Sequence, residues 1–299
     1  MLAFIRGMDI FINFCLLIVV IAVLAFAAYA LWDSAQVHRD ADKSHYEVYK
    51  PTNENKGKTF AELISINREV IAWLTVFNTN IDYPVTQTVD NMKYVNTNAE
   101  GRYSLSGAVF LDYRNPGDFS DFNNILYGHN MDKRTMFGEV GEFADSDFFD
   151  TNKYGNLYFN GRNHGIEFFA FVHTDAYNGN VFWPIVPEEL RQEYLDCLME
   201  DALQTRDIGV TTDDNLILLS TCSPNSTNGR DILIGRITDR VFLQSLTVFE
   251  DEPGFEMGEL FARPIHLLPI VIKSLLAVMI LTRARKRRLF EGGQYENKN

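Results

Sequence analysis

The stretch Leu216-Ile217-Leu218-Leu219-Ser220-Thr221-Cys222 is followed by a polar turn and then by Arg230. An apolar run of this length, bounded by turn residues, predicts a buried strand. The last residue of such a strand is expected at the rim of a sheet, where its side chain can meet a substrate. Cys222 is therefore well placed to act as a nucleophile.

A second predicted strand ends in the same manner, at Asn123-Asn124-Ile125-Leu126-Tyr127-Gly128-His129. A thiol reacts as its thiolate and needs a neighbouring base or cation to reach that state near neutral pH, which makes His129 the expected partner of Cys222. Arg230 precedes a further apolar strand, and its guanidinium can stabilise the oxyanion formed when a thiolate attacks an amide carbonyl. Cysteine, histidine and arginine together predict acyl transfer.

Each of these residues also has a structural interpretation. A lone cysteine at a strand end is more often a small buried hydrophobic residue than a nucleophile, so the hypothesis for Cys222 depends on His129 and Arg230. His173 is the one rival base, because it ends the apolar run 168–172. For His173 we expect an ordinary surface position instead.

Three segments resemble the signature of the sortases, the membrane-held cysteine transpeptidases of Gram-positive bacteria: Tyr127-Gly128-His129, Leu219-Ser220-Thr221-Cys222 and Gly229-Arg230. The chain departs from the family pattern at Leu218, where sortases carry threonine. That position has no chemical role, so the departure leaves the resemblance intact.

The resemblance covers most of residues 60 to 245 and favours class B. The segments that look like class B sequence are Ile81-Asp82-Tyr83-Pro84-Val85, the pair Asp90-Asn91 with Tyr94, Gly107-Ala108-Val109-Phe110-Leu111-Asp112, and an insert from Pro187 to Ala202 that reads as a helix. Their order along the chain makes the resemblance specific.

The pattern of short segments predicts a mainly β, α+β fold. Thr59 and Glu62 form a capping-box pattern that predicts a short opening helix. Strands are expected near 70–77, 81–86, 107–112, 123–128, 156–160, 165–173, 215–221, 231–237 and 240–248. Short strands separated by turns, with one helical insert, suggest a closed or nearly closed barrel. The resemblance implies the eight-stranded sortase barrel, with the helical insert before the cysteine strand.

Two hydrophobic segments flank this domain. Residues 10–31 form an uncharged apolar run of 22 residues, long enough to span a bilayer, although Ala28-Tyr29-Ala30 also looks like a signal-peptide cleavage site. Residues 265–282 are apolar and are followed by a basic cluster that the positive-inside rule keeps in the cytoplasm. Lys273 within this second segment favours an interfacial helix as the alternative to a span.

The predicted organisation is as follows: residues 1–32 an N-terminal membrane anchor, 33–59 a linker, 60–250 an extracellular catalytic barrel, 251–264 a second linker, 265–282 a second hydrophobic and transmembrane segment, and 283–299 a basic cytoplasmic tail. Both termini are then cytoplasmic, and the enzyme belongs to the cell membrane. A carboxy-terminal hydrophobic segment looks more like the pilus-building class C, but residues 33–60 lack the Asp-Pro-aromatic lid motif of that class.

Composition limits the partners. The chain carries a net charge of −13, and residues 33–262 hold 18 Lys/Arg against 37 Asp/Glu, a net charge of −19. This charge disfavours nucleic acid as a partner. Three cysteines are too few for a disulfide scaffold, and Cys15 and Cys197 are expected to pack in apolar surroundings. No metal-ligand spacing or phosphate loop is present, so no metal and no cofactor is expected.

The resemblance implies a catalytic trio of Cys222, His129 and Arg230. It also implies a groove in which Asn91, Tyr177 and Thr221 contact the sorting motif of a secreted protein. The expected reaction forms a thioester at the cysteine and transfers the acyl group to an amine of a cell-wall precursor. Three alternatives remain: a pilin polymerase whose acceptor is a pilin lysine, a cysteine peptidase whose acceptor is water, and a non-enzymatic, membrane-anchored binding protein that has no use for the thiol.

Overall fold

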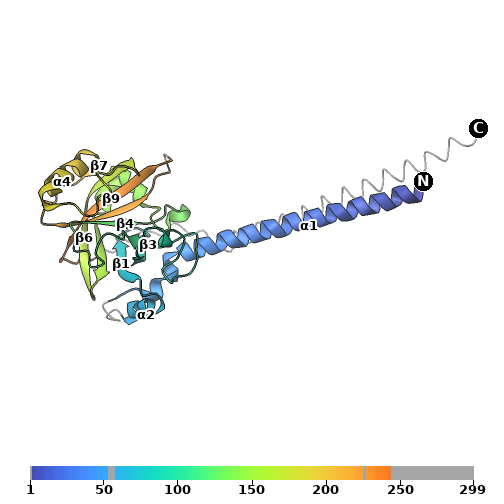
Figure 1. The fold of residues 1–299 in the computed structure, drawn as a ribbon, viewed down its shortest axis with the longest axis horizontal. Helices are drawn as coiled ribbons and strands as arrows, with labels where there is room; N and C mark the ends of the chain where they lie inside the picture. The colour runs from blue at the N-terminus through green and yellow to red at the C-terminus, as the bar shows by residue number, and fades with distance from the viewer. Residues whose placement is uncertain (1, 53–57, 225–226, 244–299) are drawn as a thin grey trace, which may run out of the picture. The chain divides into compact units, whose positions relative to one another are not determined.

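The computed structural model describes residues 2–52, 58–224 and 227–243. The helices are α1 (Leu2–Ala41), α2 (Lys58–Ile66), α3 (Ser146–Thr151) and α4 (Arg191–Glu200). The strands are β1 (Val70–Val76), β2 (Asp82–Thr86), β3 (Val109–Leu111), β4 (Asn123–Tyr127), β5 (Tyr154–Phe159), β6 (Arg162–Asp175), β7 (Ala202–Thr205), β8 (Asn215–Cys222) and β9 (Gly229–Thr238). Figure 1 shows their arrangement.

Eight of these strands close into a barrel. Neighbours are paired in the order β5-β1-β2-β3-β4-β8-β9-β6, and β5 also pairs with β6, which joins the two ends of the sheet. The pairs β2–β3 and β4–β8 are parallel, and the other pairs are antiparallel. The expected closed eight-stranded barrel is confirmed.

Some expected elements differ from those observed. β7 was not predicted. Its four residues alternate between half-buried and exposed, and they pair with Ala170–Val172 of β6. Residues 240–243 form no strand, and the rest of the strand expected over 240–248 lies outside the described residues. The helix expected in the insert is present as α4, preceded by a short turn of 3₁₀ helix at Glu188–Leu190.

α2 confirms the expected opening helix, but it begins at Lys58, one residue before the predicted cap. The Thr59 hydroxyl donates instead to the carbonyl of Lys50, 3.2 Å away. This bond ties the start of α2 to the segment that precedes it.

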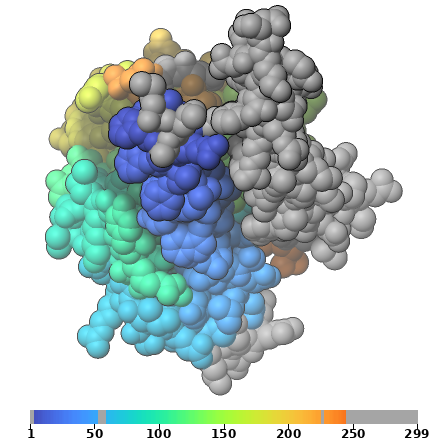
Figure 2. Space-filling model, turned by 90° about the vertical axis from the view of Figure 1, so that its right-hand side faces the viewer, coloured from blue at the N-terminus to red at the C-terminus, as the bar shows by residue number. Residues whose placement is uncertain are grey.

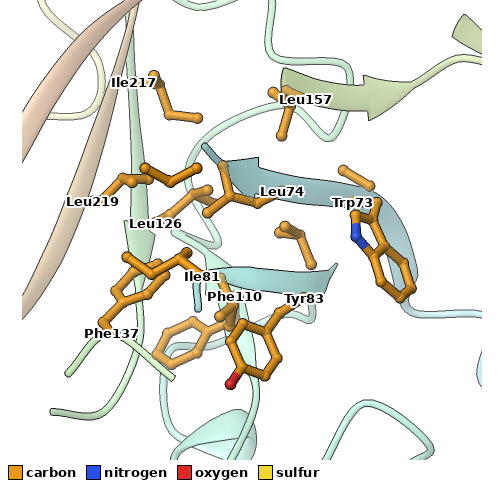
Figure 3. Close-up of a cluster of buried hydrophobic side chains, with 14 of the residues drawn as sticks. Trp73, Leu74, Ile81, Tyr83, Phe110, Leu126, Phe137, Leu157, Ile217 and Leu219 are labelled. Carbon is orange, nitrogen blue, oxygen red and sulfur yellow. The ribbon is translucent and has the colours of Figure 1, made fainter. Parts of the chain in front are cut away.

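The barrel interior holds one large apolar cluster, part of which Figure 3 shows around Leu74, Ile81 and Leu219. A second cluster lies on the outer face of β6, β8 and β9, beneath α4. Along β8, Ile217 and Leu219 belong to the inner cluster, whereas Leu216 and Leu218 belong to the outer one. The strand reads as an unbroken apolar run because both of its faces are buried.

The N-terminal helix is longer than the hydrophobic run. α1 continues to Ala41, and two 3₁₀ turns follow at Lys43–His45 and Glu47–Tyr49. Residues 33–41 of the segment expected to be a linker are therefore helical, although their sequence shows no helical periodicity. The reason is tertiary packing, since Ala41 and Tyr46 are buried in the inner cluster. Figure 2 shows this light-blue segment beside the blue-green surface of the domain.

Among the residues that the structure describes, one helix is long and apolar enough to cross a membrane. It spans Phe4–Ala41. Its large apolar side chains up to Trp32 are exposed in the structure. The second hydrophobic segment expected at 265–282, with the linker before it and the basic tail after it, lies outside the described residues.

Replacing Tyr83 with phenylalanine should destabilise the domain. The Tyr83 hydroxyl donates to the carbonyl of Ala41 (2.8 Å) and accepts from the backbone N–H of Met136 (3.0 Å). Both partners are buried, so removing the hydroxyl leaves two polar groups unpaired and should lower the free energy of unfolding by about 1–3 kcal/mol. Urea denaturation of the full chain in detergent measures this, with Tyr103→Phe at an exposed position as the control. Equal stability of the Tyr83 variant and the parent would mean that these two hydrogen bonds do not stabilise the fold.

Candidate active site

Strand register brings Cys222, His129 and Arg230 to one place. In the parallel pair β4–β8, Tyr127 lies opposite Ser220, and His129 and Cys222 each follow two residues later. In the antiparallel pair β8–β9, Cys222 lies directly opposite Arg230. The three side chains therefore meet at one end of three neighbouring strands. All three line the same groove, which has a volume of about 480 Å³.

The groove lies on the outer face of the barrel. Its floor includes Ser220 and Tyr127, which share with Cys222 and His129 the two-residue repeat of their strands. One wall comes from residues 91–114, and the other includes Ala176 and Phe182 from the insert that follows β6. The insert and the loop before β3 thus form opposite sides of a channel that runs over the cysteine.

Cys222 is a free and exposed thiol that is accessible from the groove. The other two cysteines, Cys15 and Cys197, are free thiols of intermediate exposure. Burial raises the pKa of the Cys197 thiol, and the nearby carboxylates of Asp201 and Glu200 raise it further. Cys197 is therefore less able to form a thiolate, which agrees with its expected packing role.

The ring of His129 is half-buried, and its orientation is fixed by a backbone carbonyl. Its Nε2 lies 2.7 Å from the carbonyl oxygen of Val95. Because a carbonyl oxygen only accepts, Nε2 carries a proton and donates it to this bond. Nδ1 is then the ring nitrogen that does not take part in this bond.

Arg230 is half-buried and uses one donor locally, since its Nη1 donates to the carbonyl of Gly229 at 2.9 Å. A guanidinium has five N–H donors, so this bond fixes one edge of the group and leaves donors for a ligand. The bond orients the guanidinium at the groove. Because its partner is a neutral carbonyl, the positive charge of the guanidinium is not neutralised by this bond.

A carboxylate network that the sequence did not predict lies beneath the groove wall. The fully buried Asp112 accepts two bonds from the Arg114 side chain, Nε to Oδ1 and Nη2 to Oδ2, both 2.8 Å long. The Tyr127 hydroxyl and the Asn91 amide also donate to Oδ2, at 3.0 and 2.9 Å. Burial alone would raise the pKa of Asp112, but the hydrogen bonds from Arg114 and Asn91 outweigh it and hold the pKa below its ordinary value. Asp112 appeared in the sequence only as part of a class B segment, because nothing local indicates that four side chains meet there.

The three predicted substrate contacts have different positions. Asn91 lines the groove, but its amide already bonds Asp112, and its oxygen accepts from the backbone N–H of Tyr113. Thr221 also lines the groove, and its hydroxyl donates to the carbonyl of Gly128 at 2.8 Å. Tyr177 does not line the groove, and 84% of its surface is exposed.

His173, the rival base, is placed elsewhere. Its Nδ1 lies 2.7 Å from Oδ1 of Asp231, its cross-strand neighbour on β9. Asp231 follows Arg230 directly, so its side chain points to the opposite face of the strand. His173 is not among the residues that line the groove.

Asp112→Asn should destabilise the domain at neutral pH. A folded-state pKa below the ordinary value means that the ionised carboxylate stabilises the fold above about pH 4 and that this contribution is lost as the pH falls through the folded pKa. The variant should lose about 1–3 kcal/mol at pH 7 and show a weaker acid dependence than the parent. Urea denaturation at pH 7 and at about pH 2, well below the ordinary carboxyl pKa, tests this, with the exposed Asp213→Asn as the control. A parallel acid dependence in variant and parent would rule out the network as its source.

Comparison with known proteins places the chain in a family. No protein-family model matches it. It is 31% identical over 183 residues to sortase B of Listeria monocytogenes, a match that covers 60% of this chain and 74% of that protein. The structure matches sortase B from the type II pilus of Streptococcus pneumoniae with 43% identity and a TM-score of 0.54, over 60% of this chain and 99% of that one. It also matches a Streptococcus pyogenes class B sortase involved in pilus biogenesis, with 40% identity and a TM-score of 0.56, over 61% and 99% of the two chains.

The barrel and these relatives define the class of protein as a cysteine transpeptidase, an enzyme that exchanges one peptide bond for another. Within this class, the chain belongs to the sortase B family.

Proposed function

We propose that Cys222, His129 and Arg230 carry out the transpeptidation. The observation that supports this is the register, which places a thiol, an imidazole and a guanidinium at the ends of three adjacent strands along one groove. Each group supplies a different requirement of acyl transfer: a nucleophile, a proton carrier and a donor for the oxyanion.

In the first half-reaction the thiolate of Cys222 attacks a backbone carbonyl in a sorting motif, and Arg230 donates to the oxygen as it becomes negative. His129, protonated at Nδ1, gives that proton to the departing amine, while Nε2 keeps its bond to the Val95 carbonyl. The peptide C–N bond breaks and a thioester remains on the sulfur. An acceptor amine then attacks the thioester, neutral His129 takes up its proton, and the thiolate is released.

The groove fits an extended peptide. Its walls are apolar at Val95 and Phe182 and basic at Arg114, and we expect the sorting motif to lie between them. The substrate contacts proposed from the sequence are Asn91, Tyr177 and Thr221. The Asn91 amide and the Thr221 hydroxyl already make hydrogen bonds, and Thr221 is buried, so direct contact is expected mainly through the accessible edge of Asn91.

We further propose that α1 holds the enzyme at the cell membrane with the barrel outside. From Ile10 to Trp32 the helix carries no charged residue and is apolar around its circumference, which suits a lipid environment. The acceptor is then an amine presented at the outer surface, on a cell-wall precursor or on a pilin lysine. The two pilus-associated structures favour the pilin lysine.

Cys222→Ala should abolish transpeptidation and leave the fold intact, because the change removes an exposed sulfur at a strand end. The test incubates the full chain in detergent with a peptide library and follows both cleaved motif and covalent adduct by mass spectrometry. Cys197→Ala is the matched control and should keep full activity. An acyl adduct on the Cys222 variant would show that Cys222 is not the nucleophile.

The same screen separates the acceptors. A pilin-derived lysine peptide, a wall-precursor peptide and buffer alone are each added with a cleaved library peptide. A ligated lysine product supports pilin polymerisation, a ligated wall peptide supports wall anchoring, and hydrolysis unaffected by either amine would make the protein a peptidase.

Arg230→Lys should lower kcat by ~10²-fold or more with a modest change in KM, because lysine keeps the charge but loses the planar fork of donors. Steady-state kinetics with the selected peptide measures this. The control is Arg236→Lys on the same strand, whose guanidinium pairs with Glu167 rather than lining the groove. Turnover close to that of the parent would leave Arg230 as a surface cation only.

A further inference from the structure

The parallel ladder between β4 and β8 ends before it reaches the catalytic residues. Its last register pair is Tyr127 with Ser220, and the Gly128 N–H donates to the Ser220 carbonyl at 3.2 Å. His129 and Cys222 lie beyond this point. Their separation is therefore not set by ladder hydrogen bonds between the two strands.

Two side chains continue the connection. The Thr221 hydroxyl donates to the carbonyl of Gly128 at 2.8 Å, and the Asn130 amide donates to the carbonyl of Cys222 at 2.9 Å. Each donor is the chain neighbour of one catalytic residue and reaches the strand of the other. The two bonds are thus reciprocal, and each ties the chain next to one of these two residues to the strand of the other.

The backbone at Asn130 is also fixed by the segment Met136–Phe137. The Phe137 N–H donates to the carbonyl of His129 at 2.9 Å, and Asn130 forms a β-bridge with Met136. A Cβ atom on Gly128 would lie 2.7 Å from the ring of Phe137, so the chain passes this ring as closely as a glycine allows. The short side chain of Asn130 therefore extends from a fixed backbone.

We propose that Asn130 is a positioning residue for the reaction, acting through the carbonyl of Cys222 to hold the thiol in register with the imidazole of His129. The inference rests on the proposed roles of these two residues. Cys222 is fixed on its other side by pairing with Arg230, so the bond from Asn130 completes the frame around the nucleophile. Displacing a reacting group by about 1 Å can cost ~10²-fold in rate.

Asn130→Ala and the isosteric Asn130→Asp both remove the donor. Each should lower kcat by ~10- to 100-fold, with KM for the peptide selected by the library screen changed less than about twofold. Asn130→Gln keeps a carboxamide donor and should recover part of the lost kcat. The second bond offers its own matched pair, because Thr221→Val removes the hydroxyl at constant shape and Thr221→Ser retains it. The valine variant should lose kcat and the serine variant should not.

The full chain in detergent is used throughout, with Asn180→Ala at an exposed position as the control. The pH profile of kcat/KM should shift in Asn130→Ala, because the coupling between Cys222 and His129 changes with their separation. A purely structural role would instead lower the unfolding midpoint and leave kcat and the pH profile of the folded enzyme at the values of the parent, and that result would overturn the proposal.

Cys222→Ala and His129→Ala, measured in parallel, separate this proposal from the proposed function. If both are inactive while Asn130→Ala turns over like the parent, the positioning role alone is wrong. If either retains turnover, the catalytic assignment fails and the positioning role fails with it.

Discussion

The parallel pairing of β4 with β8 is the constraint on which the site depends. Parallel strands end on the same edge of a sheet, so a histidine two residues past one strand and a cysteine at the end of the next are brought to the same edge. An antiparallel pairing of the same two segments would place these residues at opposite ends. The β8–β9 hairpin then adds Arg230 opposite the cysteine. Two pairings of different direction thus assemble three groups from positions 93 and 8 residues apart in the chain.

The burial of β8 on both faces makes this arrangement rigid. Its inward residues pack in the barrel and its outward residues pack beneath α4, so the strand has an apolar environment on either side. Burial of this kind is the main favourable contribution to folding and leaves few alternative positions for the strand. The carboxyl end of the strand emerges from this packing at Cys222, which is exposed.

The groove wall depends on a different kind of interaction. A buried carboxylate is costly unless its oxygens are hydrogen-bonded, and Asp112 meets that requirement with bonds from Arg114, Tyr127 and Asn91. The cost of leaving any of these bonds unmade holds the three donors in place. The outcome is a wall whose basic and aromatic groups have fixed positions before a substrate arrives.

Much of this protein could be predicted from its sequence. Local patterns indicated most strands, the insert helix and the apolar N-terminal helix, because hydrophobic periodicity follows directly from which face of an element is buried. The positions of Cys222 and His129 at strand ends were also evident. The sequence did not indicate β7 or the helical residues 33–41, since their order comes from pairing with β6 and from packing of Ala41 and Tyr46 in the core.

The tertiary structure alone decided what surrounds the site. The network at Asp112, the bond from His129 to the Val95 carbonyl and the bond from Asn130 to the Cys222 carbonyl join residues from 2 to 92 positions apart. In the folded structure, Tyr177 does not line the groove, and His173 pairs with Asp231. Sequence determines which segments are buried and which polar residues follow them, because those properties are local. Which polar groups meet is determined by register and barrel closure, because these bring distant segments to fixed separations.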